Sequence, residues 1–258
     1  MPNTKLTAEK LKVHFHYSKM LYLVVVLVAA MIGSLVFTMT AYQPPNERKI
    51  DIELIGNYAD TSMAGVKDVQ NALLQAGQAF ELERDGDLGL TDDPKYEIPL
   101  QEVTFLSLQY DPESSSEDTY YASQKYMVTL AAQEGDIYVL TRLLMTDLAD
   151  QGLLVPLDDY IAGGVIDPGD RELGKVTFDE LDENGTATGE QKVYALQADT
   201  LTGLYDTLGY DPTGKFLCIV AFSRNQDTAA VVLQEMIDIF EPDEEPGSAS
   251  GDPEGGAQ

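Results

Sequence analysis

One stretch of the chain is apolar and uncharged throughout. Residues 21–40 read LYLVVVLVAAMIGSLVFTMT, and a helix of about 20 such residues spans the hydrocarbon core of a bilayer. Aromatic rings favour the membrane interface, and tyrosines lie near both ends of the stretch, at Tyr17, Tyr22 and Tyr42. The pattern predicts a transmembrane helix over residues 21–42.

A cleaved signal peptide is the alternative interpretation of the same stretch. The apolar region of a signal peptide is normally shorter, about 7–15 residues. A cut after Ala41 would also place Met39, which is not a small residue, three positions before the new end of the chain. An uncleaved anchor is therefore the preferred interpretation.

The charges beside the apolar stretch predict its orientation. Residues 1–20 carry one acid, Glu9, against four lysines, at Lys5, Lys10, Lys12 and Lys19. Because positive flanks stay in the cytoplasm, residues 1–20 are expected to be a cytoplasmic tail. The rest of a single-pass protein of the cell membrane then lies outside, as a linker (43–49), a folded domain (50–240) and a disordered acidic tail (241–258).

The outer domain alternates between two periodicities. Apolar and acidic residues alternate over 50–55, which predicts a half-buried strand, whereas apolar residues recur every three or four positions over 66–80, which predicts a helix. The short apolar run 137–140 is typical of a strand buried on both faces in a parallel sheet. Further strands are expected over 98–108, 176–181, 191–196 and 216–222, and further helices over 120–133, 143–151, 157–161 and 225–240. This order predicts an α/β fold with a mostly parallel sheet.

The charge balance restricts the partners and the chemistry. The chain has 16 basic and 44 acidic residues and a net charge of −28, so a nucleic acid would be repelled. Without residues 1–20, 12 basic and 43 acidic residues remain, and both histidines, His14 and His16, are gone. A Ser-His-Asp triad and a histidine-ligated zinc site are therefore disfavoured in the outer domain, and we expect no enzyme activity and no cofactor.

The single cysteine and the acidic loops are candidates for a nucleophile and a calcium site, and each has a simple structural explanation. The single cysteine, Cys218, lies inside an apolar strand and is expected to be a small buried hydrophobe. Two acidic loops contain carboxylates, which are suited to bind calcium, but neither loop has the spacing of an EF-hand. We therefore expect solvated loops without a metal. The polar residues are Asp85, Asp87, Asp92 and Asp93 in the first loop, and Asp182, Asn184 and Glu190 in the second.

Residues 134–161 read EGDIYVLTRLLMTDLADQGLLVPLDDYI. This segment resembles the extracellular solute-binding proteins of ABC transporters, which carry an apolar strand after Gly-Asp, a helix, and a G-x-L-x-P-L-D-D-Y-I stretch. Residues 192–205 and 216–240 are similar to later parts of that family. The resemblance implies a periplasmic-binding-protein-like fold, a binding function, and a membrane permease or another envelope protein as partner.

The resemblance extends to one lobe rather than two. Members of the family have two lobes that close on a ligand, and residues 50–240 leave room for one. Sugar-binding members often stack sugars on tryptophan, which this chain lacks. Two functions therefore stay open: a membrane-anchored binding module, and a structural or interaction protein of the cell envelope that has lost solute binding. A carboxylate-dependent hydrolase is a third, disfavoured interpretation, because nothing in the sequence singles out one pair of its many acids.

The candidate ligand site follows from the fold class. In open α/β sheets, ligands gather at the carboxyl ends of the strands, which points to Asn57, Tyr58, Thr141, Arg142 and Asp199. Arg142 directly follows the buried run 137–140, and its guanidinium could pair with a ligand carboxylate. An ordinary surface ion pair is the alternative role for Arg142, and the small-molecule ligand stays open.

Overall fold

The computed structural model describes residues 8–40, 44–57, 65–88, 100–112, 114, 117–168, 174–182 and 185–241. The chain divides into two compact units, Met1–Gln43 and Pro44–Gln258.

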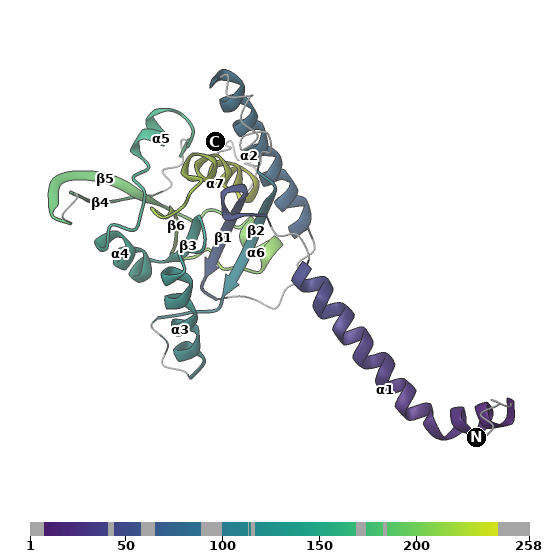
Figure 1. The fold of residues 1–258 in the computed structure, drawn as a ribbon. Helices are drawn as coiled ribbons and strands as arrows, with labels where there is room; N and C mark the ends of the chain where they lie inside the picture. Colours follow the sequence, from purple (N-terminus) through teal and green to yellow (C-terminus); the bar gives the residue numbers. More distant parts are fainter. Residues whose placement is uncertain are drawn as a thin grey trace, which may run out of the picture. The chain divides into compact units, whose positions relative to one another are not determined.

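The first unit contains the long helix α1 (Ala8–Thr40), drawn in purple in Figure 1. Its part Met20–Thr40 is long and apolar enough to cross a membrane, and its side chains are exposed. The hydroxyls of Thr38 and Thr40 donate to the carbonyls of Ser34 and Val36, at 2.9 and 2.7 Å. These polar groups are thus satisfied within the helix, as apolar surroundings require. A membrane anchor and a signal sequence both fit such a helix near the N-terminus.

The second unit is built on one six-stranded sheet. In spatial order the strands are β2 (Glu102–Leu108), β1 (Lys49–Ile55), β3 (Ile137–Thr141), β6 (Lys215–Ile219), β5 (Ala187–Gln197) and β4 (Lys175–Leu181). The pairings β1–β2 and β1–β3 are parallel, and β3–β6, β5–β6 and β4–β5 are antiparallel. The expectation of a mostly parallel sheet is therefore correct for the first three strands and wrong for the rest. The β4–β5 hairpin continues the sheet, and the short connection through α6 (Gly203–Leu208) returns the chain antiparallel as β6.

Helices cover both faces of this sheet (Figure 1). One hydrophobic cluster joins the sheet to α2 (Val66–Leu88), α5 (Asp158–Ala162), α6 and α7 (Gln226–Phe240). A second cluster joins the opposite face to α3 (Glu117–Ala131) and α4 (Arg142–Asp150). A short 3-10 helix, η1 (Asn46–Arg48), leads into β1. Two clusters on opposite faces make a three-layer α/β unit.

Burial confirms the prediction for β3 and corrects the one for β1. Ile137 to Leu140 are fully buried between β1 and β6, as the continuous apolar run predicted. β1 was expected to be half-buried, but Asp51 and Glu53 are only 5% and 6% exposed. That expectation is wrong because the layer formed by α3 and α4 covers the face on which these acids lie.

Other boundaries differ in smaller ways. Helix α2 extends to Leu88 and so includes Asp85 and Asp87, which were expected in a loop. Gly152 follows α4 with a φ of 67°, in the left-handed region that ends many helices at glycine. Of the other calcium candidates, Asp92, Asp93 and Asn184 lie outside the described residues, as does the tail after Glu241. Among the residues that the structure describes, no group of three or more acidic, histidine or cysteine side chains could hold a metal ion.

Candidate functional site

The carboxyl ends of β1, β3 and β5 lie at one edge of the sheet, because β6 runs opposite to both β3 and β5. A hollow of about 330 Å³ opens at this edge. It is lined by the first residue of α4, the start of β4 with the residue before it, the end of β5 and one ring from β6: Arg142, Gly174, Lys175, Val176, Thr177, Gln197 and Phe216. The hollow is therefore made by the antiparallel half of the sheet together with α4.

Arg142 owes its place to the turn from β3 into α4. Thr141, the N-cap of α4, has an extended backbone, and its side chain makes no capping hydrogen bond. The first turn of α4 contains no acidic residue. The positive end of the helix and the guanidinium of Arg142 are therefore not neutralised by the helix itself.

The hollow is positively charged within a strongly acidic domain. Arg142 and Lys175 are both exposed, and no carboxylate of the described residues forms an ion pair with either. No acid is among the described residues that line the hollow. Two cations that pair with no described carboxylate, beside the apolar ring of Phe216, are suited to bind a small anion. The amide of Gln197 donates to the Asp199 carboxylate, which therefore lies next to the hollow.

Side chains of the protein itself fill the space between the carboxyl ends of β1 and β3. Tyr210 is fully buried there, with its hydroxyl 2.9 Å from the carbonyl oxygen of Ile55 and 3.0 Å from that of Val139. Lys215 reaches the same place, and a Cβ on Gly56 would lie 2.8 Å from its Cε. Glycine at position 56 thus allows Lys215 and Tyr210 to close this part of the edge.

The predicted site residues that the structure describes occupy different parts of this edge, and Asp199 adjoins the hollow through Gln197. Arg142 lines the hollow, whereas the carbonyl of exposed Asn57 accepts a hydrogen bond from the Asp211 amide, at 3.4 Å. The carboxylate of Asp199 accepts hydrogen bonds from the Gln197 side chain and the Gly214 amide. Thr141 ends β3 with a buried hydroxyl that has no hydrogen-bond partner among the described residues. Tyr58 lies outside the described residues.

Sequence reasoning missed Lys175, Gln197 and Phe216. These residues lie far apart in the chain, and only the pairing of the β4–β5 hairpin with β6 places them together. The rule that ligands bind at the carboxyl ends of strands did indicate the edge of the sheet at which the hollow lies. The rule gave no reason to include a lysine at the start of β4.

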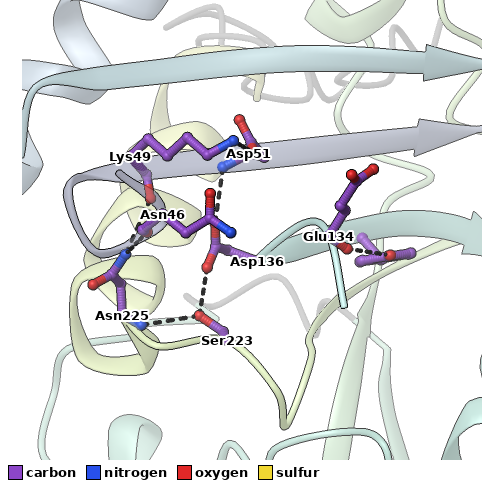
Figure 2. A network of polar contacts seen from close by, with 8 residues as sticks. Asn46, Lys49, Asp51, Glu134, Asp136, Ser223 and Asn225 are labelled. Carbon is purple, nitrogen blue, oxygen red and sulfur yellow. Dashed lines mark hydrogen bonds and ion pairs between the residues drawn. The ribbon is translucent and has the colours of Figure 1, made fainter. Parts of the chain in front are cut away.

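A second polar cluster lies at the opposite edge, where β1 and β3 begin (Figure 2). Asp136, just before β3, accepts hydrogen bonds from the Asp51 amide at 2.9 Å and from the Ser223 hydroxyl at 2.6 Å. Its own amide donates to the Asp51 carbonyl at 2.9 Å, and Lys49 pairs with the Asp51 carboxylate at 2.6 Å. Asp136 therefore joins β1 to the loop before α7.

Asn225 extends this cluster to η1. Its side-chain amide donates to the carbonyls of Asn46 and Lys49, at 2.9 and 3.0 Å, and its backbone amide donates to the Ser223 hydroxyl at 3.1 Å (Figure 2). The hollow beside the cluster is small, about 70 Å³. These contacts hold the start of the fold together, and we assign the cluster a structural role.

Glu53 of β1 is a buried acid with a strongly shifted pKa. Burial, followed by the nearby charge of Asp51, raises its pKa to about 7, while Lys125 and Lys49 partly oppose the shift. Within the described part of the chain, no side chain or backbone group forms a hydrogen bond with the Glu53 carboxyl. Tyr126 of α3 also has a buried hydroxyl without a partner among the described residues. The Tyr126 hydroxyl is closed off from solvent, whereas Glu53 keeps 6% of its surface exposed.

Cys218 has the role that the sequence suggested. It is fully buried in β6, and its thiol lies 3.6 Å from the Tyr138 carbonyl. Burial raises the pKa of the thiol to about 12. A neutral, enclosed thiol is not a nucleophile.

The chain is similar to a solved structure, although the similarity is low. No family model and no curated protein matches the chain. The structure is that of the bacterial solute receptor AcbH, described as having an exclusive preference for β-D-galactopyranose, with 14% identity and a TM-score of 0.26. The match covers 65% of this chain and 35% of the receptor, so the chain spans about a third of that receptor's length.

Proposed function

We propose that this chain is a membrane-tethered, non-catalytic binding module whose folded unit acts like one lobe of a solute-binding protein outside the cell membrane. The observation that carries the proposal is the hollow at the carboxyl edge of the sheet. Arg142 and Lys175 line it and pair with no described carboxylate, in a second unit (Pro44–Gln258) of 43 acidic and 12 basic residues. Leaving two of so few cations unpaired is explained if an anion occupies the hollow.

The chemistry of the hollow favours a small carboxylate ligand. A guanidinium can hold a carboxylate through two parallel hydrogen bonds, and a lysine adds a point charge. The family resemblance supplies the biological setting, in which the ligand is passed to or sensed with a membrane permease or another envelope protein. Because a single lobe provides one wall of a cleft, we expect weak and readily reversible binding.

Titration of the full chain in lipid nanodiscs tests this function. Succinate, glutamate and a neutral oligosaccharide serve as probes, and calorimetry measures binding. We expect the carboxylates to bind and the oligosaccharide not to bind. Arg142→Ala should weaken carboxylate binding at least tenfold, because hydrogen bonds to charged groups contribute about 1.5–3 kcal/mol. Arg142→Lys should retain part of the affinity.

Arg224→Ala is the matched control for this titration. Arg224 is exposed at the opposite edge of the sheet, where it pairs with Glu47 at 3.3 Å. Its loss removes one positive charge without touching the hollow, so binding should stay within twofold. Equal losses in Arg142→Ala and Arg224→Ala would show that net charge, and not the hollow, attracts the anion.

The membrane topology gives a separate prediction. Because lysines flank only the N-terminal side of the apolar helix, a reporter fused after Gln258 should be extracytoplasmic. Residues 1–20 should remain attached to the membrane-bound protein, which mass spectrometry of the extracted protein can check. A soluble form that begins near Tyr42 would refute the anchor and support a signal sequence.

An envelope interaction protein that has lost solute binding is the second candidate. Tyr210 and Lys215 favour it, because they fill the gap between β1 and β3 at the edge where ligands gather. Absence of binding to every carboxylate probe would favour this candidate over the binding module.

A further inference from the structure

Helix α3 exposes large apolar side chains on its outer face. Its inner face packs on the sheet through buried Tyr126 and Thr129. On the other side, Tyr120, Tyr121, Met127 and Val128 are 62–68% exposed. Adjacent apolar side chains exposed to this degree on one helix mark an interaction surface more often than scattered ones do.

The spacing along α3 fits contact with another helix. Tyr120, Gln124, Met127 and Ala131 follow one another in steps of four, three and four, the heptad spacing of helices that pack side by side. Tyr121 and Val128 form a parallel row next to them. We call these six residues the α3 seam. Its described side chains are uncharged, and it is about 16 Å long at 1.5 Å per residue.

The rings at the start of the seam contact each other. Tyr120 and Tyr121 meet edge to face, with ring centres 5.8 Å apart and planes at 70°. Such a pair offers a large apolar area at a low entropic cost of binding, as is common at interfaces. Gln124, a member of the first row, can set the register of a docked helix through its amide.

We propose that the α3 seam binds an apolar helix of a partner protein whose ends carry lysine or arginine. Charge complementarity indicates the basic ends, because exposed Asp118 precedes the seam and exposed Glu134 follows it, with Lys125 as the one cation on the helix. The second unit as a whole has 43 acidic and 12 basic residues, and this excess of acids also favours a basic partner.

Other occupants fit the seam less well. A second copy of this chain would bring two net charges of −28 together, and such like charges oppose association. The acidic tail 242–258 contains no Leu, Ile, Val, Met, Phe or Tyr with which to fill an apolar surface.

The test uses the full chain in lipid nanodiscs and two synthetic helical peptides. Both peptides have the same apolar heptad seam; one has two lysines at each end and the other has two glutamates. Fluorescence anisotropy of a labelled peptide measures binding. We expect the lysine peptide to bind at least tenfold more tightly than the glutamate peptide. The double variant M127S/V128S should weaken its binding at least tenfold, with no change in net charge.

Leu82→Ser is the matched control, because Leu82 is a 63%-exposed apolar residue on a different helix, α2. It should leave peptide binding unchanged, and all variants should keep the wild-type circular dichroism. Binding of the lysine peptide that survives M127S/V128S, or equal binding of both peptides, would overturn the proposal. A concentration-dependent dimer that M127S/V128S abolishes would instead identify a second copy as the occupant.

The seam and the anion hollow can fail independently. The hollow is lined by β4, β5, β6 and the start of α4, and none of the seam residues belongs to it. Loss of carboxylate binding in Arg142→Ala should therefore leave peptide binding intact, and the reverse should hold for M127S/V128S.

Discussion

Asp136→Ala is expected to lower the free energy of unfolding of the second unit by about 3 kcal/mol, since it breaks a buried charged hydrogen-bond network. The substitution leaves the Asp51 amide and the Ser223 hydroxyl, which now donate to the two oxygens of Asp136 at 2.9 and 2.6 Å, without their acceptor. Both groups are buried at the start of β1 and before α7. Chemical denaturation of the full chain, followed by circular dichroism, measures the loss.

Asp136→Asn separates hydrogen bonding from charge in this network. Burial raises the pKa of Asp136, while the hydrogen bonds from Ser223 and Asp51 oppose the rise, so burial disfavours the charged form and the hydrogen bonds favour it. An asparagine keeps one acceptor oxygen and should lose less than half as much stability as alanine. Asp150→Ala removes an exposed acid from α4 and should change stability by less than about 0.5 kcal/mol. Equal losses in Asp136→Asn and Asp136→Ala would contradict the hydrogen-bond explanation.

Glu53→Gln should stabilise the protein at pH 8, by about 2 kcal/mol. The folded state raises the pKa of Glu53 from 4.5 to about 7 because the carboxyl is buried next to Asp51. Between these two values the folded state holds a proton that the unfolded state has released. The contribution of Glu53 to stability is therefore fully present below pH 4.5 and is lost as the pH rises through 7.

The measurement is the difference in unfolding free energy between wild type and Glu53→Gln across pH 5–8. The difference should be small near pH 5 and should grow in favour of the glutamine variant up to about pH 8. Glu102→Gln, at an exposed position on β2, controls for the loss of one acid. A difference that does not vary with pH would show that Glu53 is not protonated in the folded protein at neutral pH.

The sequence predicted where the helices and strands of the second unit lie better than it predicted which of their faces are buried. The uninterrupted run Ile137–Leu140 correctly indicated a central strand, because both faces of that strand must be apolar. The alternation of apolar and acidic residues over 50–55 indicated a strand with one solvent-exposed face. In the structure, α3 and α4 cover that face of β1, and Asp51 and Glu53 are buried. Periodicity reports which side chains are polar, but it does not report whether a later helix will cover them.

The site was less accessible to sequence reasoning than the fold. Arg142 was found because it directly follows a buried strand, which is a local signal. Lys175 was missed because its place beside Arg142 depends on where the β4–β5 hairpin joins the sheet. Helix α6 was missed as well, since six residues are too few to show a helical period.

The single cysteine gives this protein a built-in probe of its own opening. Cys218 is enclosed in β6, and its thiol stays protonated because burial raises its pKa to about 12. An alkylating reagent can therefore label Cys218 only in molecules whose sheet has opened. The rate at which Cys218 is labelled in intact membranes would then measure the unfolding of the protein without its purification. The same enclosure leaves the folded surface without a reactive thiol, so cysteines introduced on the outer face of α3 could be cross-linked to a partner with no competing background.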